Sequence, residues 1–136
     1  MSTTVSFRVD MKPLGWQRPG GTFKRYNQKQ TRDAETLIAL EYRTQCRNTY
    51  FMGPVHIYIE AGYPIPKSAS VKTADLMRHG KIEPTVKADY DNIAKLIGDA
   101  LNQVAYHDDA QITYAVVKKV YTDLPYIYVI LKGETK

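Results

Sequence analysis

The sequence predicts an α+β protein, a two-layer single domain in which helices pack on a mixed β-sheet. Strand-like alternation of apolar and polar residues recurs in three separate stretches of the chain, and a fourth stretch, near the end, is densely apolar. Longer stretches between them repeat apolar residues at helical spacing. Because a chain of 136 residues is long enough for one core, we expect residues 1–136 to form a single domain.

The first predicted strand covers residues 5–11, where apolar and polar side chains alternate until Pro13 interrupts the pattern. A helix is expected over residues 33–50, because acidic residues near its start suit the helix dipole. Its candidate buried stripe consists of Leu37, Ile38 and Leu40. Cys46 lies in this helix and is interpreted as a small core residue rather than as a nucleophile.

Residues 55–61 form a second alternating stretch, bounded by proline-containing turns on both sides. A short helix is expected over residues 70–77. The strongest helical pattern follows at residues 90–104, whose apolar side chains make one continuous face. Asp89 is well placed to cap this helix, with its carboxylate directed at the first free backbone amides.

Two further strands complete the predicted sheet. Residues 111–121 alternate between apolar and polar side chains, and we expect Lys118 and Lys119 to mark an exposed end. A turn at residues 122–125 leads into the last strand, residues 126–131. The apolar density of this strand predicts a central position in the sheet.

The composition narrows the class of protein. A formal net charge of +5 favours a polyanionic partner such as nucleic acid. A single cysteine excludes an internal disulfide and favours a reducing compartment. No apolar run reaches the length of about 18 residues that a membrane span needs, and the first ten residues lack the pattern of a secretory signal. We therefore expect a cytoplasmic protein without a membrane contact.

Acidic side chains gather in one part of this basic chain. Residues 89–109 hold five carboxylates, where an even spread of 14 over 136 residues would put about two. Mg²⁺ prefers oxygen ligands, and the basic remainder suits a polyanionic substrate. Together they indicate metal-dependent phosphodiester chemistry. The five carboxylates are Asp89, Asp91, Asp99, Asp108 and Asp109, and Lys95 lies among them.

Each acid also has a purely structural explanation. Carboxylates in the first helical turn would complement the helix dipole. Asp91, Lys95 and Asp99 lie four residues apart and would form an ion-pair ladder. Asp108 and Asp109 would form a turn before the next strand. The predicted helix is about 21 Å long, so the sequence leaves open whether this pair reaches the acids at its start.

If the acids meet, three carboxylates and several waters would hold one Mg²⁺. The metal would lower the pKa of a bound water and offset charge on the scissile phosphate. Lys95, one turn from Asp91, would stabilise the pentavalent phosphate or orient the nucleophile. His107 beside the acids is a candidate general base, although a surface histidine next to a turn is the commoner arrangement.

One string in this region, KADYDNIAKLIGDALNQVAYHDDAQI, resembles the signature of the RusA family of Holliday-junction resolvases, often carried by phages and prophages. The pattern is Asp-x-Asp-Asn-x-x-Lys, then Asp-Ala-Leu, then Asp-Asp-x-Gln-Ile. Residues 89–95, 99–101 and 108–112 fill it, and the ordered match extends over residues 84–121. Many members have proline where this chain has Ala88.

The resemblance implies a homodimer with an α/β fold that cuts four-way DNA junctions in recombination and repair, with Mg²⁺ as cofactor and Mn²⁺ as a substitute. The family's metal-binding acids match Asp89, Asp91 and Asp109, and its catalytic lysine matches Lys95. These four are the predicted catalytic residues. A two-fold dimer offers two equivalent sites for paired nicks, and acids from two subunits would line one face. The expected location is the cytoplasm of a bacterium or a phage-infected host cell.

Charge alone predicts the DNA contacts. Residues 13–31 contain no acid and have the composition of a long basic loop. Residues 67–87 are also rich in lysine and arginine. Trp16 or Phe23 would stack on an unpaired base or anchor the loop. We expect phosphate contacts from seven residues, Lys12, Arg18, Lys24, Arg25, Lys67, Lys72 and Lys87.

Two functions of different classes fit these observations. The first is a Mg²⁺-dependent endonuclease that nicks four-way junctions. The alternative is a non-catalytic module that holds branched or single-stranded DNA by basic loops and aromatic side chains, with acids that only cap and solubilise. Substitution of the acids separates the two, because only the endonuclease should lose nicking while keeping its affinity for DNA.

Overall fold

The computed structural model describes residues 2–14 and 25–135. Four strands form one mixed sheet in the order β1-β4-β2-β3. β4 pairs antiparallel with β1 and with β2, whereas β2 and β3 run parallel. The predicted α+β class, the mixed sheet and the central position of the last strand are confirmed. The strands are β1 (Ser2–Val9), β2 (Phe51–Pro64), β3 (Ile112–Thr122) and β4 (Tyr126–Thr135).

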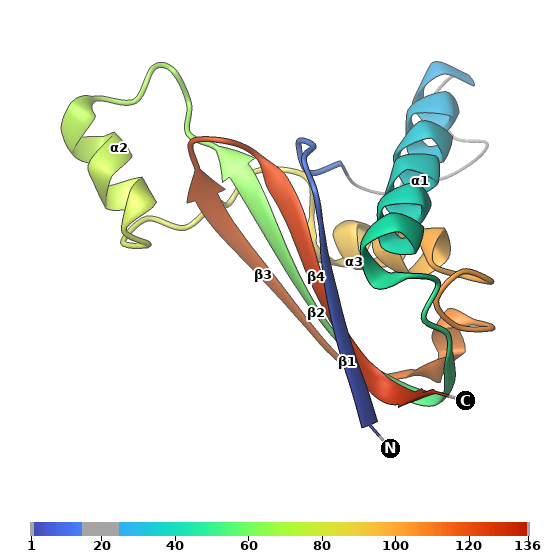
Figure 1. Cartoon of the computed structure of the whole chain (residues 1–136). Coiled ribbons are helices and arrows are strands. Elements are labelled where there is room, and N and C mark those ends of the chain that lie inside the picture. The colour runs from blue at the N-terminus through green and yellow to red at the C-terminus, as the bar shows by residue number, and fades with distance from the viewer. Residues whose placement is uncertain (1, 15–24, 136) are drawn as a thin grey trace.

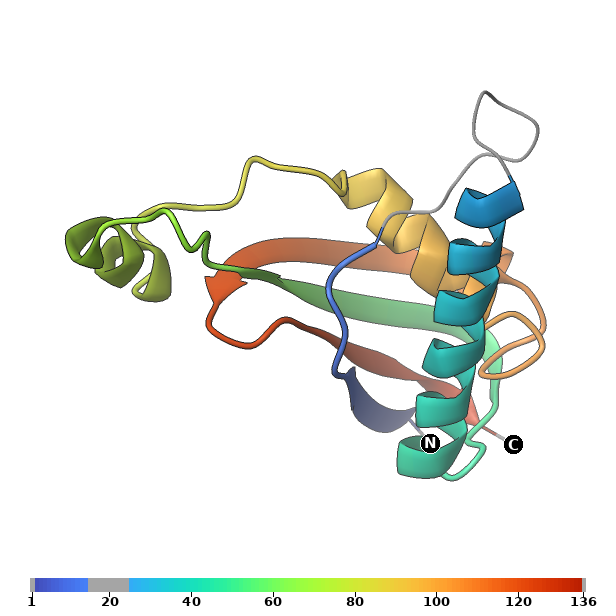
Figure 2. The same ribbon diagram turned by 90° about the horizontal axis from the view of Figure 1, so that it is seen from above.

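Two helices lie on the same face of this sheet, α1 (Arg25–Cys46) and α3 (Tyr90–Ala100), as Figures 1 and 2 show. The short helix α2 (Val71–Arg78) stands on an arm beyond the end of β2. Parallel neighbours such as β2 and β3 require a crossover connection, and the chain between them supplies it through α2, α3 and the 3-10 helix η1 (Asp109–Gln111). In the part of the chain that the structure describes, no helix is long and apolar enough to cross a membrane.

The core lies between the sheet and the two helices. Alternate side chains of β1, β2 and β4 are buried on the helix-covered face, as the period of two predicts. From α3, Ile93 and Leu96 enter this core with no exposed surface, and from α1 Ile38 does the same. An edge-to-face contact between Phe7 and Tyr42, with ring centroids 5.4 Å apart, joins β1 to α1.

α1 differs from its prediction over residues 33–50 at both ends and in its buried stripe. It begins at Arg25 and therefore includes the end of the predicted loop 13–31. It ends at Cys46 because the next two residues take left-handed φ angles of 52° and 58°. Leu37 and Leu40 are 36% and 55% exposed, since they face away from the sheet. The buried face of the helix instead follows Ala34, Ile38, Tyr42 and Cys46. Burial raises the pKa of the Cys46 thiol to about 11, in agreement with its predicted core role.

α3 is shorter than predicted and ends at Ala100 rather than at residue 104. The chain turns after it because Gln103 takes a φ of 64° and its amide donates to the Tyr106 carbonyl. Tyr106 is fully buried, and its hydroxyl donates to the Gly98 carbonyl at 2.9 Å. This fold-back brings the second group of acids beside α3 instead of beyond its end.

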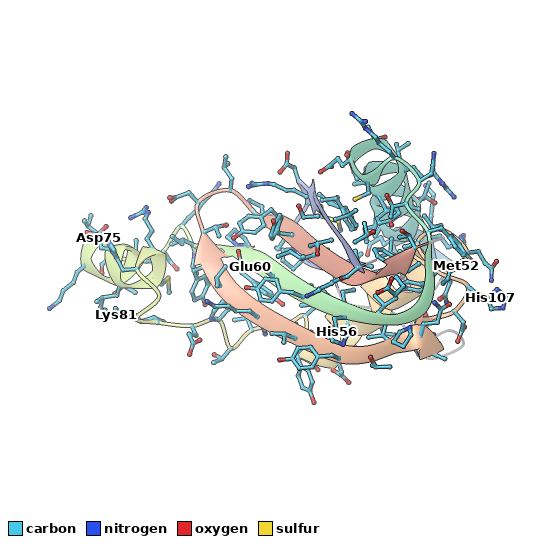
Figure 3. All side chains as sticks on the ribbon, turned by 60° about the horizontal axis from the view of Figure 1, so that its bottom comes forward. Met52, His56, Glu60, Asp75, Lys81 and His107 are labelled. Carbon is cyan, nitrogen blue, oxygen red and sulfur yellow. The ribbon has the colours of Figure 1, made fainter. Side chains whose placement is uncertain are left out.

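Raised tyrosine pKa values predict a loss of stability in alkali. Burial raises the pKa of Tyr63 and of Tyr126 to about 12, from an ordinary value of 10.0, and Tyr126 also donates its hydroxyl to Glu60 on the sheet (Figure 3). A tyrosine with a raised folded-state pKa contributes stability that is fully present below pH 10 and is lost as the pH rises toward 12. We expect the free energy of unfolding in urea to fall over that range. A free energy that stays constant from about pH 10 to 12 would contradict this account.

Candidate active site at the start of α3

The predicted acids Asp89 and Asp91 occupy the start of α3. Asp89 is the N-cap residue by its extended backbone, with φ of −73° and ψ of 155°, but its carboxylate makes no capping hydrogen bond. The expectation that this side chain caps the helix is therefore wrong. Both acids are exposed. The carboxylate of Asp89 is thus available for another ligand, two residues from that of Asp91.

The two adjacent acids after the fold-back are held differently. Asp108 caps η1, because its carboxylate accepts from a backbone amide of that helix at 2.9 Å and the Gln111 side chain completes the capping box. The amide of Asp109 donates to Asn102 Oδ1 at 2.8 Å. Its carboxylate is turned toward α3, where a Cβ at Gly98 would lie 3.3 Å from Oδ2. The structural explanation accounts for Asp108 and leaves the Asp109 carboxylate beside the helix.

Sequence reasoning missed the two residues that place Asp109. Asn102 holds its amide, and Gly98 leaves room for its carboxylate. The signal that could have found this close approach is the glycine itself, because glycine is unfavourable inside a strongly helical pattern and marks a packing reason. No comparable signal exists for Asn102, whose role depends on the fold-back.

The Asp109 carboxylate lies beside Gly98 of α3. Gly98 is on the same face of this helix as Asp91 but further along its axis. Asp91 and Gly98 are seven residues apart, which is almost two full turns and about 10 Å along the helix axis. Lys95 lies between these two residues along the helix axis. Within residues 2–14 and 25–135, no three His, Cys, Asp or Glu side chains are grouped so that they could hold a metal ion.

These donors fit a hard cation by their chemistry, although the described part of one chain does not group three of them. Mg²⁺ commonly binds to protein through one or two carboxylates and fills its other positions with water and substrate phosphates. Asp89 and Asp91 would supply these two carboxylate ligands. The participation of Asp109 in the same site stays a prediction.

Further carboxylates lie close to Asp109. Burial raises the pKa of the Asp99 carboxyl, Lys95 opposes that rise, and Asp109 adds to it. Burial and then the charge of Asp99 raise the pKa of Glu35 on α1. Carboxylates from α1, α3 and η1 therefore repel one another on this side of the helix. Such repulsion is relieved by protonation or by a cation.

His107 is held by local contacts. Its Nδ1 lies 3.2 Å from the Gln103 amide nitrogen, and the same amide donates to its carbonyl at 2.6 Å. Figure 3 places it at the opposite end of the molecule from Asp75 and Lys81 on the α2 arm. These contacts fit the surface interpretation of His107.

The predicted DNA contacts are distributed over several elements. Four of the residues that are predicted to contact phosphates, Lys12, Lys67, Lys72 and Lys87, are exposed. Arg25 opens α1, but its side chain lies outside the described part. Arg18 and Lys24 lie outside the described residues, as do Trp16 and Phe23.

A groove of about 340 Å³ lies beside the segment that leads to Asp89. Lys12 and Lys87 contribute cationic side chains to it, and none of the described residues that line it is acidic. A polyanionic strand could therefore approach the start of α3 along this groove. Its lining consists of Lys12, Tyr63, Pro64, Pro66, Val86, Lys87 and Tyr121.

The α2 arm is connected to the sheet by an arginine. Arg78 Nε donates to both carboxylate oxygens of Asp123 in the β3–β4 turn at 3.0 Å. Its Nη1 also pairs with Asp75 at 2.9 Å. Exposed pairs of this kind stabilise little, so this contact connects the arm to the β3–β4 turn without adding much stability. Lys67 and Lys72 belong to this arm.

Two comparisons with known proteins bear on the family of this chain. The family model described as "Endodeoxyribonuclease RusA" matches residues 10–132. The chain is also 30% identical over 138 residues to the uncharacterized protein YqaN of Bacillus subtilis (strain 168), an alignment that covers 94% of this chain and 95% of that protein. The family match spans the whole acidic region 84–121, including Lys95. The chain therefore belongs to the RusA family of endodeoxyribonucleases.

Proposed function

We propose that this protein is a Mg²⁺-dependent endonuclease that nicks four-way DNA junctions as a homodimer. Membership of an endodeoxyribonuclease family supports the nuclease activity. The observation that carries the finer proposal is the carboxylate of Asp89, which is exposed at the start of α3 and makes no capping hydrogen bond. It stands beside Asp91 and next to a lysine-lined groove that suits a DNA strand.

In this proposal Asp89 and Asp91 hold the metal, and Asp109 is the third predicted ligand. The metal would supply Lewis-acid charge neutralisation and a water of lowered pKa. Lys95 would donate hydrogen bonds to the scissile phosphate and stabilise its negative charge as the bond breaks. Lys12 and Lys87 would fix the strand through its flanking phosphates, which sets register without reading sequence.

The homodimer is part of the proposal because the substrate has near two-fold symmetry. Two equivalent sites would cut two opposed strands. Within one chain, Asp109 lies beside Gly98, whose position on α3 is almost two helical turns, or about 10 Å along the axis, from that of Asp91. We therefore expect acids from two subunits to line one face and to complete the ligand set.

A non-catalytic DNA-binding module is the second candidate function. It is favoured by one observation, that no three potential ligands are grouped for a metal within the described residues. In that case the basic groove and the arm would bind a branched or single-stranded DNA, and the acids would serve only solubility.

A nicking assay with an end-labelled four-way junction separates these candidates. With Mg²⁺ we expect paired nicks on opposed strands, none in EDTA, and little cutting of a linear duplex of the same sequence. A protein that binds the junction but does not nick it at any Mg²⁺ or Mn²⁺ concentration is the binding module instead.

Gly98→Ala tests the predicted role of Asp109. The added methyl would stand 3.3 Å from Asp109 Oδ2 and displace that carboxylate by a few tenths of an ångström. We expect single-turnover nicking to fall about tenfold. The melting temperature should not fall, because alanine is favoured over glycine in a helix by about 1 kcal/mol. Gly53→Ala, where the new methyl meets nothing within 4 Å, is the matched control. Unchanged nicking in Gly98→Ala would contradict a role for Asp109.

A further inference from the structure

The segment 86–88, which leads into α3, is held on the sheet by two side chains from neighbouring strands. The Tyr63 hydroxyl, from β2, donates to the Ala88 carbonyl at 2.6 Å. The Lys119 ammonium, from β3, donates to the Val86 carbonyl at 2.6 Å. Two carbonyls of this short segment are therefore fixed from the same sheet.

The two side chains also contact each other. Tyr63 is only 2% exposed, and the Lys119 Nζ lies 4.9 Å from the centre of its ring, within range of a cation–π interaction. In the parallel β2–β3 pair, Ala61 is the register partner of Lys119, and Tyr63 is that of Tyr121. The side chains of Tyr63 and Lys119 thus lie on one face of the sheet, where they contact each other and the segment 86–88.

Lys118 and Lys119 were both predicted to be exposed, but they have different environments in the structure. Lys118 is exposed and Lys119 is half-buried, because successive residues of a strand point to opposite faces. An immobilised lysine loses rotamer freedom. A lysine that served only to attract DNA would gain nothing from this contact with a carbonyl and a ring.

The segment that these side chains hold ends at Asp89. The Asp89 carboxylate is not fixed by a capping hydrogen bond, so its location depends on the backbone that precedes it. The charge of Asp89 also reaches Tyr63, whose pKa is raised mainly by burial and then by this carboxylate.

We propose that Tyr63 and Lys119 are positioning residues that hold the segment 86–88 so that Asp89 presents its carboxylate to the metal. The inference deepens the proposed function and rests on it. Residues that orient metal ligands without touching the metal typically change affinity or activity by about 10- to 100-fold when they are removed. Neither Tyr63 nor Lys119 is assigned any step of the chemistry.

The test compares Lys119→Met with Lys118→Met, which removes the same charge from the opposite face of β3. Mn²⁺ is the probe, and its affinity is measured by electron paramagnetic resonance. We expect Lys119→Met to weaken Mn²⁺ binding and to slow single-turnover nicking about 10- to 100-fold. Hydrogen exchange of the amides of residues 86–91 should become faster. Lys118→Met should leave all three quantities unchanged.

Two further variants separate position from charge and from global stability. Lys119→Arg should keep most of the Mn²⁺ affinity, because a guanidinium also donates to a carbonyl and stacks on an aromatic ring. Tyr63→Phe removes only the hydroxyl, and it should speed exchange in residues 86–91 and weaken Mn²⁺ binding. It is the deciding variant if Lys119→Met does not fold.

Failure of this inference differs from failure of the proposed function. If the wild-type protein binds Mn²⁺ and nicks, but Lys119→Met and Tyr63→Phe behave like Lys118→Met, the positioning role is overturned and the nuclease stands. If the wild-type protein neither binds Mn²⁺ nor nicks, the proposed function fails, and hydrogen exchange alone decides whether the two side chains hold the segment.

Discussion

Asp91→Asn is expected to lower junction nicking about a thousandfold or more while the protein stays folded. A bound metal contributes several kcal/mol to stabilising the transition state, and each 1.36 kcal/mol corresponds to about a factor of ten in rate. Asp91 is exposed, so the substitution should change the free energy of unfolding by no more than about 0.5 kcal/mol. The measurement is the single-turnover nicking rate with Mg²⁺, alongside junction affinity by fluorescence anisotropy.

Junction affinity should survive or increase in Asp91→Asn, because a negative charge near the DNA phosphates is removed. Asp33→Asn is a matched control, since Asp33 is an exposed helical carboxylate 4.0 Å from a lysine one turn away, Lys29. We expect wild-type nicking and affinity from it. Nicking by Asp91→Asn at the wild-type rate would contradict the proposal, and so would loss of binding together with nicking.

Lys95→Ala has the second largest expected effect. Removal of a donor that stabilises charge in a transition state typically costs about 10²- to 10³-fold in rate, and added Mg²⁺ should not restore it. The melting temperature should hardly change, because exposed pairs one helical turn apart contribute only a few tenths of a kcal/mol. The nicking rate at saturating Mg²⁺ and the melting temperature are the two measurements.

The control for Lys95→Ala is Lys29→Ala on α1, which removes an exposed lysine with an acidic neighbour four residues away. Its nicking rate should stay within a few-fold of wild type. If Lys95→Ala instead lowers stability and leaves the rate of the folded fraction unchanged, the lysine serves an ion-pair ladder rather than catalysis.

The strands could be predicted because one face of the sheet is buried and the period of two is visible in the sequence. Ile127, Val129 and Leu131 all enter the core, and this apolar density indicated a central strand correctly. The buried face of α1 could not be predicted in the same way. Leu37 and Leu40 are apolar but face away from the sheet, and only the packing of α1 against β1 and α3 decides which apolar residues are covered.

The candidate residues of the site came from the sequence, but their geometry did not. The gathering of acids indicated a cation site, and the resemblance to the RusA family singled out Asp89 and Asp109, whereas the location of Asp109 depends on the fold-back after α3 and on contacts with Asn102 and Gly98. Apart from that resemblance, nothing in the sequence distinguishes Asp108 from Asp109. Their roles differ because Asp108, and not Asp109, caps η1.

Anomalous scattering from a Mn²⁺-soaked crystal tests the central claim most directly. The account predicts an anomalous peak about 2.0–2.3 Å from carboxylate oxygens of both Asp89 and Asp91. A peak that lies away from these two acids, or no peak at a Mn²⁺ concentration that supports full nicking, would contradict a metal centre at the start of α3.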